Sequence, residues 1–319
     1  MPSSSTESER RWPRLPVLLT CLLAAALGPL PAIATTPTEL AVTIDDLPTT
    51  GTLPPGTTRA AIADQMIETL RRHAVPGVYG FVNGGQVHDY PELERILLAW
   101  RKGGLLLANH TFSHLDLDQV SAPEFIADIE LNESLLERLS PPGSWKYFRY
   151  PYLHQGNAPE KLSAVRRWLA SRGYRIAPVT VYVEHSEWSD AYARCVARQD
   201  EPAVTRVKER YLEASRARFG WARALSAQLL KRQVKHVLLL HVDALDAAVL
   251  DDLLRLHRAG GATFIGLETA LQDPAYARYE DTPGDGDRTF LIQVARAQGV
   301  AEIPSAKAGA PTEIRRICR

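Results

Sequence analysis

The sequence predicts an α/β fold, a distorted parallel (β/α)7 barrel with a helical insertion and a C-terminal tail. Short apolar segments typical of buried strands alternate seven times with amphipathic helical segments. The unusual polar residues follow the strands, so we expect them together at the carboxyl-end rim of the sheet. With 37 basic and 37 acidic side chains and 45% hydrophobic residues, the composition is that of a globular protein. The balanced charge indicates neither nucleic acid nor a membrane surface as the main partner.

The first 34 residues have the features of a secretory signal peptide. Three arginines between residues 10 and 14 precede an apolar segment over 15–30, and Ala32-Ile33-Ala34 forms a small-x-small cleavage pattern. We therefore expect export to the periplasm or the extracellular space, with no stable membrane span after cleavage. The alternative is an uncleaved anchor, although the apolar segment is short for a span.

Seven strands are expected from apolar and β-branched runs, several of them bounded by glycine or proline. The third leads into two histidines, the fourth into Arg149, and the sixth ends at His241, whereas Pro178 interrupts the fifth. Their ranges are 39–44, 77–82, 104–108, 145–148, 174–183, 235–240 and 262–265.

The expected helices show apolar residues at helical spacing. The first has Thr57 or Thr58 as its N-cap, and Pro141-Pro142-Gly143 ends the third, whereas Asn83-Gly84-Gly85 reads as a loop. Their ranges are 57–73, 90–102, 122–139, 158–171, 245–259 and 267–271.

Two segments depart from this alternation. Residues 186–233 have a helical pattern that is long for a barrel connection, so we expect an insertion over one side of the rim. A linker begins near residue 282, and the tail to 319 has little periodicity. We thus expect a catalytic domain over 35–281 and a separate tail. In an oxidising compartment Cys195 and Cys318 can pair and tie that tail to the domain.

Candidate chemistry begins with two acids and two histidines. Asp45 and Asp46 end the first strand, where buried carboxylates are costly unless they have a function. His110 and His114 are four residues apart, so on a helical turn they would share one face and hold one borderline metal ion such as zinc. Two histidines and one aspartate would leave an open position for water.

The remaining rim residues complete a set that can hydrolyse an amide or ester. The second carboxylate can act as general base, held ionised and oriented by Arg149. His241 can protonate a leaving amine. A backbone N–H near Tyr152 can stabilise the oxyanion, whereas Pro151 has no N–H to donate. His154 and His185 also lie near the rim and are interpreted as substrate contacts at most.

Four motifs, in order, resemble those of the polysaccharide deacetylases, carbohydrate esterase family 4. Thr43-Ile44-Asp45-Asp46-Leu47-Pro48 is similar to the family's T-F-D-D-G-P motif, and His110–His114 to its H-[ST]-x-x-H motif. Arg149–Tyr152 matches R-x-P-[YF], and Leu239-Leu240-His241 matches L-x-H. The resemblance spans residues 39–271 and implies a distorted barrel that removes acetyl groups from sugars with the help of a metal.

The resemblance also implies a role for each residue. Asp45 would be the base, Arg149 its orienting partner, the Tyr152 N–H the oxyanion donor and His241 the acid. The implied metal ligands are Asp46, His110 and His114, usually to zinc, although Co²⁺, Ni²⁺ or Mn²⁺ suits the same ligands. Leu239, with Trp188 and Pro151, would contact the substrate.

The sequence departs from the family in two places. Leu47 replaces the glycine of the first motif. After the fifth strand the family has an aspartate that partners the acid histidine, but no aspartate is evident here. Glu184 is the first candidate for that partner, followed by Asp190 and Asp243.

The leading hypothesis is therefore an exported metal-dependent deacetylase acting on an acetylated glycan. The altered segment after the fifth strand leaves open a catalytically weak carbohydrate-binding relative of the same fold. The insertion leaves open a metallo-amidase for a small non-sugar substrate, if it caps the groove.

Overall fold

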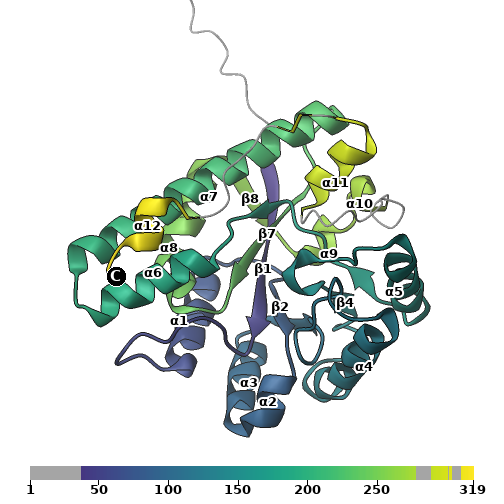
Figure 1. The fold of residues 1–319 in the computed structure, drawn as a ribbon, viewed down its shortest axis with the longest axis horizontal. Helices are drawn as coiled ribbons and strands as arrows, with labels where there is room; N and C mark the ends of the chain where they lie inside the picture. Colours follow the sequence, from purple (N-terminus) through teal and green to yellow (C-terminus); the bar gives the residue numbers. More distant parts are fainter. Residues whose placement is uncertain (1–36, 278–288, 301, 304–309) are drawn as a thin grey trace, which may run out of the picture. The chain divides into compact units, whose positions relative to one another are not determined.

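A curled sheet of parallel strands surrounded by helices forms the body of the chain (Figure 1). The computed structural model describes residues 37–277, 289–300, 302–303 and 310–319, so the expected signal peptide lies outside the described residues. The strand order is β5-β4-β3-β2-β1-β7-β6, with β8 paired to β1. The strands are β1 (Thr38–Leu47), β2 (Tyr79–Val82), β3 (Leu106–Asn109), β4 (Tyr147–Phe148), β5 (Arg175–Ile176), β6 (Val181–Tyr182), β7 (His236–His241) and β8 (Ala262–Ile265). The predicted distorted parallel barrel is confirmed.

Strand β1 is the centre of the sheet. It pairs with β7 along residues 40–45, with β8 along 38–41 and with β2 along 43–47. Since Leu40 pairs with both β7 and β8, and Thr43 with both β7 and β2, the strands β2 and β8 share the edge of β1 opposite β7. The end of β1, Asp45-Asp46, therefore lies between the ends of β2 and β7.

The predicted single fifth strand over 174–183 is instead two short strands at the two ends of the sheet. β5 pairs with β4, whereas β6 pairs with β7. Pro178 lies between them, and because proline has no N–H it cannot continue a strand ladder. The Ala177 N–H donates to Phe148 O at 2.8 Å and the Thr180 N–H to Val237 O at 3.0 Å, so this stretch connects the two ends of the curled sheet.

Side-chain caps start several of the helices. Thr58 accepts from the Ala61 N–H, and Ser121 with Glu124 forms a capping box. The helices are α1 (Arg59–Arg72), α2 (Gly85–Asp89), η1 (Pro91–Leu93), α3 (Glu94–Lys102), α4 (Ala122–Leu139), η2 (Pro151–Leu153), α5 (Pro159–Ser171), α6 (Ser186–Ala197), α7 (Glu201–Leu230), α8 (Ala244–Ala259), α9 (Leu267–Ala270), α10 (Pro274–Ala277), α11 (Phe290–Ala297) and α12 (Thr312–Arg316). The expected loop at Asn83–Gly85 is wrong in part, because a short helix begins at Gly85.

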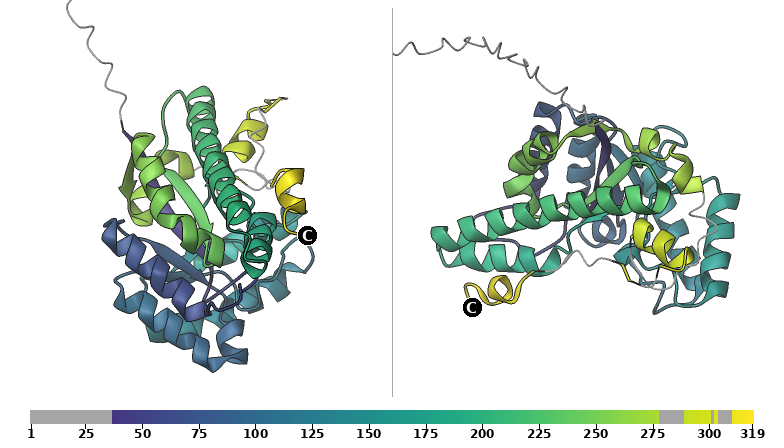
Figure 2. Two further views of the ribbon diagram at one scale, coloured as in Figure 1. Left: turned by 90° about the vertical axis from the view of Figure 1, so that its left-hand side faces the viewer. Right: turned by 90° about the horizontal axis from the view of Figure 1, so that it is seen from above.

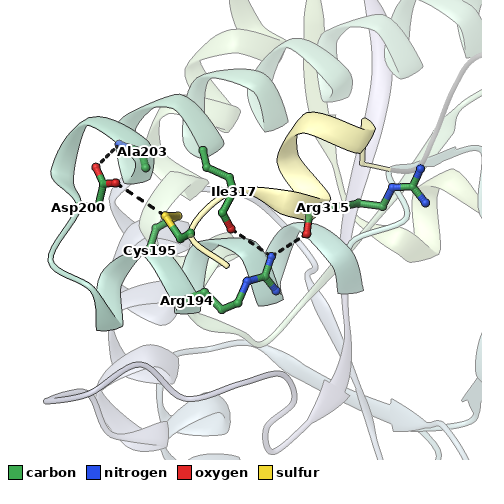
Figure 3. The surroundings of a disulfide bond; sticks show 7 residues. Arg194, Cys195, Asp200, Ala203, Arg315 and Ile317 are labelled. Carbon is green, nitrogen blue, oxygen red and sulfur yellow. Dashed lines mark hydrogen bonds between the residues drawn. A yellow bond between two sulfur atoms is a disulfide. The ribbon is translucent and has the colours of Figure 1, made fainter.

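The predicted helical insertion consists of α6 and α7, which pack on each other and on α8 (Figure 2). Within the described tail, α11 packs on α7 and α12 on α6. A disulfide joins Cys195 of α6 to Cys318, with the two Cα atoms 5.2 Å apart. Arg194 adds a hydrogen bond from Nη2 to the carbonyl of Arg315 at 3.1 Å (Figure 3). The expected pairing of these cysteines is therefore present.

Among the helices within the described residues, none combines the length and the apolarity that crossing a membrane requires.

Candidate active site

Three side chains from the ends of two strands converge on one point. Nε2 of His114 lies 3.2 Å from Oδ1 of Asp46, and Nε2 of His110 lies 3.4 Å from the same oxygen. One ligand atom from each residue lies within 4.8 Å of the other two. The sequence predicted these residues as a group, and the fold brings them together.

The histidines converge through a loop and not through the helical turn that their spacing suggested. Thr111 and His114 have φ of 63° and 56°, in the left-handed region that a right-handed helix excludes. The loop is held from both sides. Nδ2 of Asn83 donates to His110 O at 2.6 Å, and the Ser113 N–H donates to Oδ2 of Asp128 at 2.9 Å.

Two buried asparagines, which the sequence interpretation missed, support the same loop. Nδ2 of Asn132 donates to Val82 O at 2.7 Å and to Oδ1 of Asn109 at 3.0 Å. The Asn109 oxygen also accepts from the Thr111 N–H at 2.9 Å. In the sequence, Asn132 interrupts the apolar face of α4 and Asn109 ends an apolar strand. A buried side-chain amide needs hydrogen-bond partners, and these two asparagines provide them for each other and for the loop. A polar residue within each of these apolar segments was the sequence feature that could have identified the two asparagines as supports of the site.

The residues present fit a divalent metal ion. Nδ1 of His110 lies 2.8 Å from Arg149 O, and a carbonyl can only accept, so Nδ1 carries the proton and the lone pair of Nε2 points toward Asp46. Oδ1 of Asp46 is buried and has no hydrogen-bond partner among the described residues. When no metal ion is bound and the imidazoles of His110 and His114 are protonated, their hydrogen bonds hold the pKa of Asp46 well below its ordinary value, although burial raises it. One anionic oxygen and two imidazole nitrogens are a donor set typical of zinc.

Asp45 lies beside this cluster and is paired with Arg149. Nη1 of Arg149 is 3.2 Å from both carboxylate oxygens, while its Nε donates to Ala177 O at 2.6 Å and its Nη2 to Oγ1 of Thr43 at 3.2 Å. Both side chains are buried. Burial raises the pKa of Asp45 above its ordinary value even though the guanidinium lowers it. Oδ2 of Asp45 also lies 3.8 Å from Nε2 of His110.

Backbone strain is concentrated here. Five residues of the site have φ in the left-handed region, namely Asp46 (65°), Thr111 (63°), His114 (56°), Tyr152 (58°) and Leu153 (59°). Such conformations cost free energy in residues other than glycine and persist where the surrounding structure imposes them, often at functional sites. The ring of Tyr152 packs edge-on against His114 with centroids 4.5 Å apart, and this tyrosine is 52% exposed.

A pocket of about 420 Å³ joins most of the predicted residues. Its lining includes Asp45, Asp46, His110, His114, Tyr152, Glu184, Leu239 and His241. Pro151 is buried next to the lining residues Tyr150 and Tyr152. Trp188 is not brought to this pocket, because it lies in α6 with its ring packed against Tyr211 of α7 at 5.6 Å.

A histidine pair forms another wall of the pocket. The rings of His185 and His241 stack with centroids 3.7 Å apart and planes 7° apart. Nε2 of His185 lies 3.0 Å from Oδ2 of Asp243, the third candidate for a partner of His241. Glu184 lines the pocket, and its pairing with His241 stays a prediction. The sequence analysis placed His185 near the rim and interpreted it as a substrate contact at most.

Several solved structures are similar to this chain, at low sequence identity and with TM-scores below 0.5. A peptidoglycan deacetylase from Bacillus subtilis is 18% identical, with 77% of this chain and 94% of that chain covered and a TM-score of 0.47. A family 4 carbohydrate esterase from Streptomyces lividans is 18% identical, with 74% and 97% covered and a TM-score of 0.46. A mutant family 4 pseudoenzyme with restored enzymatic activity is 16% identical, with 74% and 68% covered and a TM-score of 0.47. None of the curated proteins compared with the chain is significantly similar to it.

The family assignment comes from the sequence itself. Residues 32–174 match the family model described as polysaccharide deacetylase. The matched segment contains Asp45 and Asp46, both histidines of the metal-ligand cluster, and the Arg149–Tyr152 motif, whereas Glu184 and His241 lie beyond it. With these motifs assembled in one pocket, residues 32–174 of the chain are identified as a segment of the polysaccharide deacetylase family.

Proposed function

We propose that the chain is an exported, metal-dependent hydrolase that removes N-acetyl or O-acetyl groups from a polysaccharide or oligosaccharide. The observation that carries the proposal is the convergence of Asp46, His110 and His114 beside the Asp45–Arg149 pair in one pocket. A divalent ion held by these ligands, most often zinc in such a donor set, would polarise the acetyl carbonyl and lower the pKa of a water molecule.

The protein's own groups would then act as follows. Asp45, oriented by Arg149, removes a proton from the attacking water. The Tyr152 N–H stabilises the oxyanion, and Leu239 contacts the acetyl methyl group. A histidine on the pocket wall protonates the leaving amine, a role that the family resemblance assigns to His241 with Glu184 as its partner.

One observation supports the weaker, carbohydrate-binding alternative. Nδ1 of His241 is buried without a hydrogen-bond partner among the described residues, and burial together with the neighbouring His185 lowers the pKa of His241 to about 3. If no other group donated the proton, the leaving amine would be protonated slowly. The other alternative, a metallo-amidase for a small substrate, requires the helical insertion to cap the pocket. Of residues 186–230 only Ser186 lines the pocket, so the structure gives that alternative little support.

The test combines metal content with acetate release by the exported protein. Acetylated chito-oligosaccharides, peptidoglycan fragments and acetylated xylan form the panel, each assayed with zinc-, cobalt-, nickel- or manganese-loaded protein. Acetate release that stops on chelation and returns with metal is expected. Metal binding without acetate release from any glycan would favour the binding relative, and release without metal would refute the proposal.

A further inference from the structure

A second histidine, directly before the helical insertion, lines the pocket. His185 follows β6 and precedes the first residue of α6, and its buried side chain lines the pocket next to His241. The stacking distance of 3.7 Å puts the two imidazoles in direct contact, so a positive charge on one ring disfavours a positive charge on the other.

Asp243 determines which ring is charged. Its Oδ1 accepts from the Asp246 N–H at 2.7 Å and caps α8, and its Oδ2 lies 3.0 Å from Nε2 of His185. A fully buried carboxylate at a helix N-terminus stays ionised and requires a partner cation. Although burial lowers the pKa of His185, Asp243 raises it to about 9, so His185 is charged at neutral pH.

His241 has the opposite environment. Its backbone N–H donates to Oδ2 of Asp246 at 2.7 Å, but no carboxylate is paired with its ring in the described part of the chain. A cationic ring stacked on its face disfavours a second charge. At neutral pH His241 is therefore uncharged, and a neutral imidazole is a far poorer acid than an imidazolium.

We infer that His185, ion-paired with Asp243, is the proton donor to the leaving nitrogen, with neutral His241 stacked against it. This inference rests on the proposed function and reassigns one role within it. The water that attacks the acetyl carbon loses a proton to Asp45. As the C–N bond breaks, its electron pair takes the proton from His185, which gives the free amine and acetic acid. The proton on Asp45 then leaves and His185 is protonated again from solvent.

The charged and titratable groups around His185 come from three elements. Asp243 and Asp246 belong to the start of α8, Asp46 to the end of β1, and His241 to the end of β7. Oδ1 of Asp246 accepts from the Tyr211 hydroxyl of α7 at 2.8 Å, so the insertion supports the same group of side chains.

The experiment compares two leaving groups in two matched variants, His185→Gln and His241→Gln. An N-acetylated chito-oligosaccharide needs protonation of its amine, whereas 4-nitrophenyl acetate releases a phenolate that leaves without a proton. For H185Q we expect kcat on the amide to fall about 100-fold and kcat on the ester to change less than about threefold. For H241Q we expect no such difference between the two substrates.

Other outcomes separate the possibilities. A selective loss of amide hydrolysis in H241Q and not in H185Q would return the role to His241 and overturn the inference. Equal loss of both activities in H185Q, with normal zinc content and melting temperature, would also overturn it. If H185Q does not fold, an NMR titration of the wild-type histidines decides, because a His185 imidazole that is neutral at pH 7 is incompatible with the inference. Failure of the wild-type protein to hydrolyse either substrate would instead count against the proposed function.

Discussion

Nη1 of Arg149 lies 3.2 Å from each carboxylate oxygen of Asp45, and both side chains are almost completely buried. The remaining nitrogens of the guanidinium are fixed by Thr43 and by the carbonyl of Ala177. The carboxylate of Asp45 is thus held in one orientation beside the cluster of Asp46, His110 and His114. The Arg149 guanidinium compensates the negative charge that is buried at this end of β1.

Replacing Asp45 by asparagine should abolish deacetylation while metal remains bound. The variant keeps the shape of the side chain but removes the base, and we expect kcat to fall by about 10³-fold. Acetate release and metal content, measured on the same preparation, check this. The matched variant R149K keeps the charge but loses the planar fork, so it should show a smaller loss. Wild-type activity in D45N would mean that another group is the base.

Zinc binding should depend on His114 and not on His154. His154 belongs to a second group, with Asp116 and Asp118, whose ligand atoms also lie within 4.8 Å of one another. Nδ1 of His154 already lies 2.9 Å from Oδ1 of Asp116, so that histidine has a partner without a metal. Metal analysis after dialysis should give one zinc per chain for wild-type protein and H154Q, and none for H114Q. Two zinc ions in the wild-type protein would contradict this expectation.

The buried amide of Asn83 should influence metal affinity from outside the ligand set. It donates to the carbonyls of His110 and Thr111 at 2.6 and 3.2 Å and so fixes the histidine loop. Removal of such supporting contacts typically weakens metal binding by about 10- to 100-fold, and we expect this of N83A in a competitive zinc titration. Asn157 donates to a backbone carbonyl on an exposed loop, so N157A is the control and should bind zinc normally.

The disulfide should stabilise the chain by closing a long loop. Cys195 and Cys318 are 123 residues apart, and loss of a bridge of this kind costs about 2–5 kcal/mol in the free energy of unfolding. Urea denaturation of C318S should show that loss. Reductant should destabilise the wild-type protein to a similar extent and leave C318S unchanged. A further loss in C318S on reduction would show that another bridge contributes.

Acid should destabilise the fold partly through His257. This residue is buried between α7 and α8, where its Nε2 lies 3.1 Å from the Ser215 hydroxyl, and burial lowers its pKa to about 4. The unfolded chain takes up a proton near pH 6.5, before the folded chain does, so stability is complete above that pH and falls between about 6.5 and 4.

Urea denaturation across this pH range tests the effect of His257. In H257Q the slope of the free energy of unfolding against pH should be smaller by up to about 1.4 kcal/mol per pH unit. The slope that remains belongs in part to His236, whose pKa burial also lowers to about 4. An unchanged slope in H257Q would show that His257 titrates normally in the folded chain.

Local sequence patterns were sufficient for most elements. The helix over 122–139 and the strand over 262–265 have the predicted limits, because capping residues and apolar periodicity act over a few neighbouring residues. The fifth strand was only partly predictable. Pro178 signalled an interruption, but the pairing of its two halves with different strands depends on partners far away in the chain.

The sequence by itself determined which side chains stand at strand ends, and therefore that Asp45, Asp46 and the histidine motif would share one rim. Only the tertiary structure decided how they meet, through a left-handed loop held by buried asparagines, and it placed Trp188 in the packing of the insertion. It also paired His185 with Asp243 beside His241. The physical reason is the sequence separation over which each interaction acts. Backbone propensity and helix capping depend on neighbouring residues, whereas segments distant in the sequence determine the partner and the charge of a buried polar group.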